Sequence, residues 1–200
     1  MAKERLKSPR VKLFVALDLP ETVRIGVDAW GTRELTDPAL RPVLPQSLHV
    51  TLAFLGWRQE KEIARLSEIV AASGAPAPSL AFGQPVQRPE RGRPRLFALP
   101  VASPQAMALQ AGVEDMLVAA RLYKPERRPF WPHVTVARVK REERGSKRPA
   151  RVSKPPGALS EELLRPFDAV RITLYRSELR PWGAQYTPLA QVELPAGGQQ

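Results

Sequence analysis

Both histidines of this 200-residue chain lie in the same short pattern. Residues 49–52 read His-Val-Thr-Leu and residues 133–136 read His-Val-Thr-Val, so a threonine follows each histidine two positions later. With an apolar fraction of 43%, the chance that both histidines match by accident is below ~10⁻⁴. Side chains alternate between the two faces of a strand. Each copy therefore predicts a strand with a histidine and a threonine on one face and apolar residues on the other.

The residue types of the polar face indicate proton transfer near an anion. Imidazole has an unperturbed pKa of ~6.5, so His49 and His133 could divide the roles of acid and base. The hydroxyls of Thr51 and Thr135 suit the charged oxygens of a phosphoryl group. The alternative is structural, because a single strand histidine is often only hydrogen-bonded and threonine is common in strands. The matched pair favours a catalytic site.

On the opposite face, strict alternation predicts apolar side chains that point into the core. The expected core residues are Val50, Leu52 and Phe54 in the first strand, and Val134 and Val136 in the second.

The chain is strongly basic, with 31 Lys and Arg against 20 Asp and Glu, a net charge of +11 and a pI of about 10.7. Such an excess favours polyanionic partners, with nucleic acid first. The alternative is that a basic proteome simply prefers arginine on solvated surfaces. The length fits one ordinary domain or two small lobes that share an interface.

The composition argues against disulfides, metal sites, a membrane span and secretion. The chain has no cysteine, which excludes disulfides and thiolate-bound metals. Two histidines far apart in the sequence, without a tight acidic cluster, give little from which to build a metal site, so we expect chemistry without metal or cofactor. No run approaches the ~18 apolar residues of a membrane span. Residues 1–5 lack the apolar segment of a secretory signal, so we expect a cytoplasmic protein without membrane contact.

Hydrophobic periodicity predicts strands that alternate with helices. Helix starts are expected at Pro20 and at Ser103-Pro104, because proline suits the first helical turn and serine caps it. The segments 79–86 and 95–101 are expected to form a hairpin. The expected strands are 11–19, 49–56, 79–86, 95–101, 133–139, 167–175 and 185–194, and the expected helices include 60–72 and a short helical turn over 159–164.

Each half of the chain contains a helix, a proline-rich turn and a motif strand, which indicates a diverged internal duplication. We expect two lobes that face each other across a groove, within a single domain over 11–194. Residues 1–10 are expected to be a basic flexible N-terminus, 140–156 a mobile basic loop, and 195–200 a flexible tail. The basic loop could grip nucleic acid or could simply be solvated.

The sequence resembles the bacterial 2'-5' RNA ligase family, also described as RNA 2',3'-cyclic phosphodiesterases, within the two-histidine (2H) phosphoesterase superfamily. The two motif copies, the second preceded by Trp-Pro, are the specific part of the resemblance. The matching segments are 13–20 (Leu-Phe-Val-Ala-Leu-Asp-Leu-Pro), 49–56 (His-Val-Thr-Leu-Ala-Phe-Leu-Gly), 130–138 (Phe-Trp-Pro-His-Val-Thr-Val-Ala-Arg), 174–179 (Leu-Tyr-Arg-Ser-Glu-Leu) and 183–186 (Gly-Ala-Gln-Tyr).

The resemblance implies an α+β, bilobal 2H phosphoesterase fold, in which two pseudo-symmetric lobes with antiparallel sheets line a central cleft and helices lie outside. It implies hydrolysis of RNA 2',3'-cyclic phosphate to a 2'-phosphomonoester without metal, with reversible 2'-5' joining of RNA in some relatives. His49 would be the proton donor to the departing 3' oxygen, and His133 the base that activates water. Thr51 and Thr135 would hold the non-bridging oxygens. The residues alone leave acid and base interchangeable.

The sequence does not decide the substrate or the roles of three further residues. The expected partner is RNA with a 2',3'-cyclic end, such as a tRNA fragment, bound by a monomer. The alternatives are a cyclic phosphodiesterase of small nucleotides or ADP-ribose cyclic phosphate, and a non-catalytic RNA-binding module. Strict alternation places Arg138 on the face opposite His133 unless the strand bends there. Trp131 and Tyr186 could stack on a base or ribose, or could pack in the core.

Overall fold

The computed structural model describes residues 9–180 and 183–195. The expectations for the N-terminal arm, for the turn between Arg180 and Gly183, and for the C-terminal tail fall largely outside these ranges. The helices are α1 (Glu21–Glu34), α2 (Ile63–Ala72) and α3 (Pro104–Ala119), with 3-10 turns at Pro45–Ser47 and Glu60–Glu62. The strands are β1 (Arg10–Asp18), β2 (Leu40–Pro42), β3 (His49–Gln59), β4 (Ser79–Phe82), β5 (Val86–Arg88), β6 (Leu96–Ala102), β7 (His133–Val139), β8 (Phe167–Asp168), β9 (Arg171–Arg180) and β10 (Gly183–Glu193).

The strands form one 10-stranded sheet in which all neighbouring pairs are antiparallel. Its order is β10-β9-β1-β3-β7-β6-β4-β8, with β2 paired to β7 and β5 paired to β6. Antiparallel sheets can be solvated on one face and covered on the other. The α+β fold with antiparallel sheets and helices outside is confirmed.

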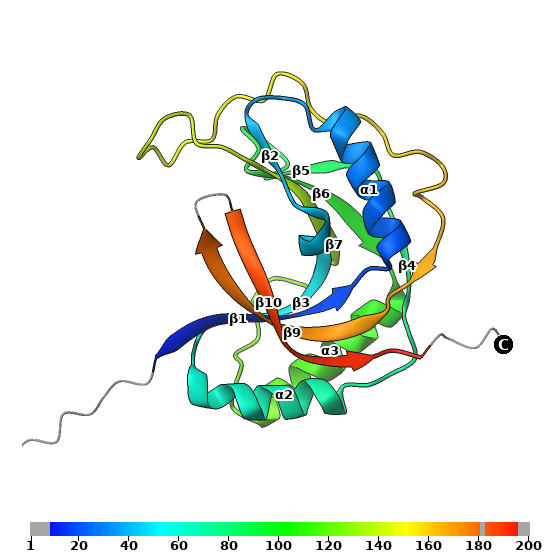
Figure 1. The fold of residues 1–200 in the computed structure, drawn as a ribbon, viewed down its shortest axis with the longest axis vertical. Coiled ribbons are helices and arrows are strands. Elements are labelled where there is room, and N and C mark those ends of the chain that lie inside the picture. Colours follow the sequence, from blue (N-terminus) through cyan, green and yellow to red (C-terminus); the bar gives the residue numbers. More distant parts are fainter. Residues whose placement is uncertain (1–8, 181–182, 196–200) are drawn as a thin grey trace, which may run out of the picture.

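Two halves of the sheet meet where β3 pairs with β7 at Val50 and Val134. One half contains β1, β3, β9 and β10 and is covered by α2 and α3; the other contains β7, β6 and β2 and is flanked by α1 (Figure 1). Two helices are exchanged between the halves. The chain leaves β1 for α1, which lies beside β2 and β7, and leaves β6 for α3, which packs against β3 and α2.

The core lies between the helices and the back of this sheet. Leu13–Leu17 of β1 are almost fully buried, as are Leu66 of α2, Leu117 of α3 and Trp30 of α1. Full burial of one leucine stabilises the fold by ~1.5–3 kcal/mol. Because the core packs the back of the sheet, its other face is free for polar side chains.

The predicted helix starts are confirmed. Ser103 caps α3 by accepting a hydrogen bond from the Ala106 amide at 2.9 Å, and Pro104 is the first helical residue. Pro20 immediately precedes α1. The predicted helix over 60–72 begins as a 3-10 turn and continues as α2.

Two segments that were each predicted to be one strand are two shorter strands in the structure. The segment 79–86 is broken after Phe82, since β4 pairs with the end of β6 and β5 with its beginning, and the amide of Gly83 donates to Pro100 at 2.8 Å. The predicted hairpin is therefore β5–β6. The segment 167–175 is divided between β8, which pairs with β4, and β9, which pairs with β1. The short helical turn predicted over 159–164 is present as hydrogen-bonded turns over 161–164, in which the amides of Leu163 and Leu164 donate to the carbonyl of Ser160.

The basic loop over 140–156 is attached to the rest of the molecule at several points. Asp37 Oδ2 accepts hydrogen bonds from the amides of Ser153 and Lys154 at 2.7 and 2.8 Å. Arg93 forms an ion pair of 2.7 Å with Glu142. The mobility of this loop stays a prediction. No helix in the described residues is long and apolar enough to cross a membrane.

Candidate active site

The two motif strands are neighbours in the sheet, and their pairing brings the two polar faces together. Val50 of β3 is paired with Val134 of β7 in an antiparallel register. Within the described residues this is the one residue pair that joins the two strands, and the antiparallel direction puts His49 on the side of Thr135 and Thr51 on the side of His133. The predicted polar quartet is therefore one compact group.

All four side chains line one cleft of about 1390 Å³. The cleft runs between β1 and β3 on one side and the ends of β2, β7, β9 and β10 on the others. Its lining is Arg10, Val11, Lys12, Phe14, Arg41, Pro42, Val43, Leu44, Gln46, Ser47, His49, Thr51, Phe54, Trp57, Leu96, His133, Thr135, Arg138, Arg176, Ser177, Glu178, Leu179, Arg180, Gly183, Ala184, Gln185 and Tyr186.

Both imidazoles are held by the same kind of hydrogen bond. The Nδ1 atom of His49 lies 2.8 Å from the carbonyl oxygen of Ser47, and that of His133 lies 2.8 Å from the carbonyl oxygen of Trp131. A carbonyl can only accept, so Nδ1 must carry the hydrogen in each ring. The second nitrogen, Nε2, is then the atom that gains and loses a proton.

Burial favours the neutral form of both rings. It is the main cause that lowers the pKa of His49 to about 4, against the bond to Ser47; the charges of His133 and Arg138 lower this pKa further. Burial also lowers the pKa of His133, and the charges of Arg88 and Arg138 add to this effect. A bound anion would act in the opposite direction, because opposite charge favours the protonated form.

The ring of His49 is packed among aromatic side chains. Phe14 stacks on it with centroids 4.9 Å apart, and Tyr186 meets it edge-on at 5.3 Å. Behind Phe14, Tyr175 stacks at 5.2 Å and donates a hydrogen bond of 2.8 Å to Asp18. These contacts fix the ring plane of His49.

Asp18 is the buried anchor of this aromatic group. Its carboxylate also accepts a hydrogen bond from Thr173 at 2.9 Å and lies 3.2 Å from the guanidinium of Arg171. Burial raises the pKa of Asp18, and the hydrogen bonds from Tyr175 and Thr173 partly offset this effect. Asp18 and Tyr175 were not predicted as site residues from the sequence, although both lie in segments that carry the family resemblance.

The ring of His133 is fixed in a different way, by Trp131 and Arg88. The indole of Trp131 stacks on the imidazole with centroids 4.1 Å apart and planes 14° apart, and the Arg88 guanidinium lies 4.0 Å from the indole centroid. Two groups this close to one centroid would overlap on a single face, so they cover opposite faces of the indole. Neither Trp131 nor Arg88 lines the cleft. Trp131 thus supports the histidine and does not offer a free face to a base, whereas Tyr186 does line the cleft.

Matching bulges in β3 and β7 overturn the expectation from strict alternation. Along β1, Val15 is paired with Ala53 and Ala16 with Thr51, so Leu52 is an extra residue. Along β6, Phe97 is paired with Ala137 and Ala98 with Thr135, so Val136 is an extra residue. An extra residue reverses the faces of the side chains that follow it.

The reversal brings Phe54 and Arg138 to the cleft face. Phe54 was predicted to be buried but is 46% exposed and lines the cleft. Arg138 also lines the cleft, and its charge acts on both histidines. The bend that the sequence left open for Arg138 is present. The signal in the sequence was an alanine directly after each motif, which gives two consecutive buried residues.

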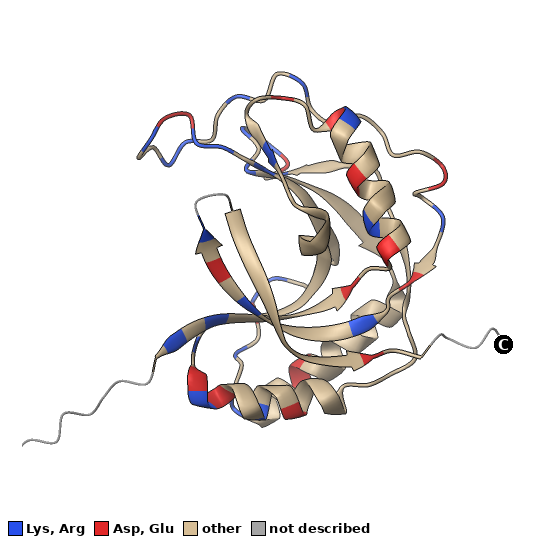
Figure 2. Ribbon diagram, in the orientation of Figure 1, with Lys and Arg blue, Asp and Glu red and all other residues tan. Residues whose placement is uncertain are grey.

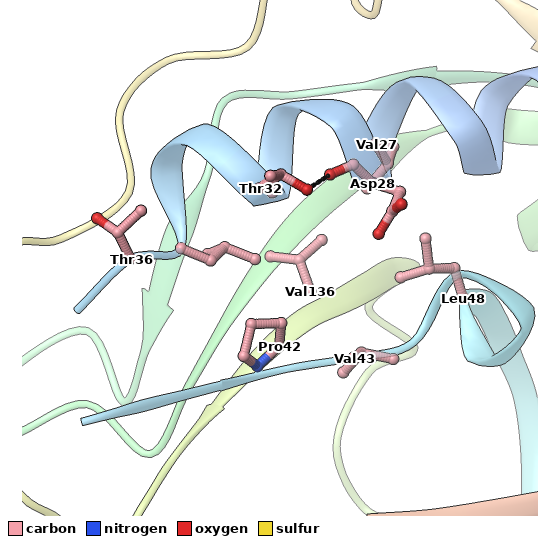
Figure 3. Close-up of a pocket in the computed structure, with 10 residues that line it drawn as sticks. Val27, Asp28, Thr32, Thr36, Pro42, Val43, Leu48 and Val136 are labelled. Atoms are coloured by element: carbon pink, nitrogen blue, oxygen red, sulfur yellow. Dashed lines mark hydrogen bonds between the residues drawn. The ribbon is translucent and has the colours of Figure 1, made fainter. Parts of the chain in front are cut away.

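A smaller hollow of about 430 Å³ lies on the other side of the motif strands, between α1 and β2 (Figure 3). Its walls are largely apolar, and its polar groups include Asp28 and Thr32, whose hydroxyl donates to the Asp28 carbonyl at 3.0 Å. It contains no histidine, so the large cleft is the candidate site. Among residues 9–180 and 183–195 no group of three or more His, Asp or Glu side chains could hold a metal ion.

Comparison with known protein families identifies the superfamily of this chain. The model of the 2'-5' RNA ligase superfamily matches residues 19–180. The chain belongs to the 2'-5' RNA ligase superfamily. The family resemblance stated for the two motif copies is therefore confirmed. The catalytic roles of the four superfamily motif residues stay predictions.

Relatives in this superfamily cover almost the whole chain. An RNA 2',3'-cyclic phosphodiesterase of Thermus thermophilus is 34% identical over 92% of this chain and 90% of its own length. One of Escherichia coli is 30% identical, over 89% and 93%. The crystal structure of Escherichia coli LigT complexed with 3'-AMP has a TM-score of 0.73 and 26% identity, over 93% and 99% of the two chains.

Proposed function

We propose that this protein hydrolyses the 2',3'-cyclic phosphate at the end of an RNA to a 2'-phosphomonoester. The observation that carries the proposal is the pair of imidazoles in one cleft, each with Nδ1 tied to a carbonyl and Nε2 left to exchange a proton. The relatives are named RNA 2',3'-cyclic phosphodiesterase, which supports opening of the cyclic phosphate as the reaction.

In the proposed mechanism water attacks the phosphorus in line with the bond to the 3' oxygen. Nε2 of His133 takes a proton from the water as the new P–O bond forms. Nε2 of His49 gives a proton to the 3' oxygen as its bond to phosphorus breaks, and the phosphate stays on the 2' oxygen. The opposed positions of the two motifs across the β3–β7 pair suit a displacement that needs base and acid on opposite sides.

The charge that develops on the phosphoryl oxygens needs donors aimed at it. Thr51 and Thr135 are the proposed hydroxyl donors, and Arg138 is the proposed cationic one. Arg138 enters this set because the β7 bulge turns it toward the cleft. The assignment of acid to His49 and base to His133 comes from the family, since the hydrogen bonds of the two rings are equivalent.

The same site would support reversible 2'-5' ligation. The 5' hydroxyl of a second RNA takes the place of water, attacks the cyclic phosphate and leaves a 2'-5' phosphodiester, while the 3' oxygen departs with the proton from His49. A small cyclic nucleotide is the second candidate substrate class. The six cations in the cleft lining, against one carboxylate, favour RNA. A tRNA fragment as substrate, a monomeric state and a cytoplasmic location stay predictions.

The decisive experiment is to incubate the protein with EDTA and an RNA that ends in a 2',3'-cyclic phosphate, and then to identify by phosphorus NMR which hydroxyl keeps the phosphate. We expect a 2'-phosphate product with chelator present, and turnover lowered by orders of magnitude in the double variant His49→Ala/His133→Ala. A 3'-phosphate product would reverse the leaving group. Full activity of the double variant would refute the proposed site.

A further inference from the structure

Aromatic and basic side chains continue the cleft outward from the histidines along β1 and β3. Arg10 and Lys12 of β1, together with Phe54 and Trp57 of β3, line the same cleft as the two imidazoles. We call these four residues the outer strip. The proposed hydrolysis assigns no role to any of them.

The two aromatic rings of the outer strip are unusually open. Trp57 is 60% exposed and Phe54 is 46% exposed. Trp57 is paired with Lys12 and Phe54 with Phe14 in the β1–β3 register, and a second bulge at Leu55 keeps the two rings on one face. In the described residues Trp57 stacks on no other aromatic ring. Exposed aromatics next to a cleft indicate a surface for a ligand.

The charges of the outer strip suit a chain of phosphates. Lys12 Nζ lies 5.0 Å from the centroid of Phe54, and Arg10 donates a hydrogen bond of 3.0 Å to the carbonyl of Trp57. In the part of the chain that the structure describes, neither cation pairs with a carboxylate. Glu178, the only acidic residue of the cleft lining, is paired with Arg180 at 3.0 Å. Basic residues mark the outer part of β1 in Figure 2.

We propose that the outer strip binds the nucleotides that precede the cyclic phosphate in a single-stranded RNA. Bases stack on Trp57 and Phe54, and the phosphates between them contact Lys12 and Arg10. Alternation of aromatic rings with cations is the usual construction of sites that hold single strands without reading their sequence. This inference rests on the proposed function, and it specifies an oligonucleotide as the substrate class.

The cleft face from His49 to the end of the outer strip is long enough for more than one nucleotide. The eight steps from His49 to Trp57 extend over roughly 20–25 Å at the rise of a strand, allowing for the two bulges. A cyclic mononucleotide would reach only the inner part of the cleft. An oligonucleotide would occupy both parts, so its kcat/KM should exceed that of the mononucleotide.

The test measures kcat/KM for a tetranucleotide with a 2',3'-cyclic end and for the cyclic mononucleotide of the same terminal base. Trp57→Ala should lower the ratio of the two values about tenfold, because loss of one stacked base has an effect of this order. Trp57→Phe should retain most of the ratio. The control is Ile25→Ala on α1, where the side chain is also 60% exposed but lies outside the cleft.

Binding provides a second readout that does not need turnover. Fluorescence anisotropy with a labelled tetranucleotide that ends in a 2'-phosphate should show weaker binding to Trp57→Ala. Lys12→Ala should reduce the slope of log K against log salt by about one, whereas Lys124→Ala, at an exposed position that does not line the cleft, should not. If Trp57→Ala and the native protein have the same ratio of kcat/KM values and the same affinity for the tetranucleotide, the proposed role of the outer strip is refuted, while the proposed hydrolysis is not. Absence of hydrolysis with native binding intact would instead overturn the proposed function.

Discussion

The Nδ1 hydrogen of each catalytic candidate is held by the carbonyl two residues earlier, so only Nε2 can take part in proton transfer. We expect His49→Ala and His133→Ala each to lower kcat by ~10²–10⁴-fold. The double variant should lose little more than the worse single variant, since the two groups act in one transition state. Initial rates on an RNA with a cyclic end measure the effect. A melting temperature for each variant separates lost chemistry from lost packing, and simple additivity would contradict the shared transition state.

The pH profile should show lowered histidine pKa values. Burial lowers the pKa of His49 to about 4 and also lowers the pKa of His133 from its ordinary value of 6.5. The productive form needs one ring protonated and the other neutral, so lowered pKa values of both rings move the pH range of this form toward acid. We therefore expect kcat/KM, which reports the free enzyme, to have its maximum on the acid side of neutrality. The maximum of kcat should lie at higher pH, because the bound phosphate favours protonation of both rings. A kcat/KM maximum above pH 7 would contradict the burial of the rings.

Arg88 is expected to act on catalysis through His133, without contact to the substrate. Its charge lowers the pKa of His133, and it covers the far face of Trp131. We expect Arg88→Gln to move the limb of the kcat/KM profile that His133 controls to higher pH. Arg88→Lys should retain more of the native profile because it keeps the charge. A uniform loss of kcat without a change of profile would indicate a purely structural role.

For the strands, the sequence predicted where the site lies but not every residue that faces the cleft. The alternation of side chains along a strand was enough to predict that His49 shares a face with Thr51, and His133 with Thr135. This prediction needed no knowledge of contacts with other strands. Phe54 and Arg138 could not be placed by periodicity, because a bulge depends on the partner strand and reverses every face beyond it. The same limit applies to the breaks in segments 79–86 and 167–175, which change partners within the sheet.

The bulge in β7 predicts a role for Arg138 in binding the phosphate. Arg138→Ala should lower kcat/KM by ~10²–10³-fold, as for loss of one donor to a developing charge. Arg151→Ala, at an exposed position outside the cleft lining, is the matched control and should retain activity. Single-turnover rates at saturating RNA separate chemistry from binding. An unaffected Arg138→Ala would show that the cleft holds the phosphate by its hydroxyls alone.

For the whole molecule, the resemblance and the duplicated pattern led to the correct fold class. The sequence did not show that one continuous sheet joins the two halves, since its long-range order depends on pairing between distant segments such as β1 with β9. Net charge predicted a polyanionic partner, and six of the cations line the same cleft as the histidines.

The continuous sheet predicts a single cooperative unfolding transition. Far-ultraviolet circular dichroism and tryptophan fluorescence should give the same urea midpoint, because Trp30 of α1 and Trp57 of β3 lie in the two halves that one continuous sheet joins. Val50→Ala, at the junction of the halves, should lower the free energy of unfolding by about 1–3 kcal/mol and shift both probes together. Separate midpoints would show that the halves unfold independently.

The exchange of α1 and α3 between the halves has a consequence for cutting the chain. A cut in the connection between α2 and β4 would leave an N-terminal fragment with His49 but without α3, β9 and β10, and a C-terminal fragment with His133 but without α1. Each piece would expose the apolar surface that the other normally covers. Neither fragment alone would hydrolyse the substrate, and activity would return only when the two fragments are mixed. The rate would then depend on the concentrations of both fragments, so it would report how well they associate.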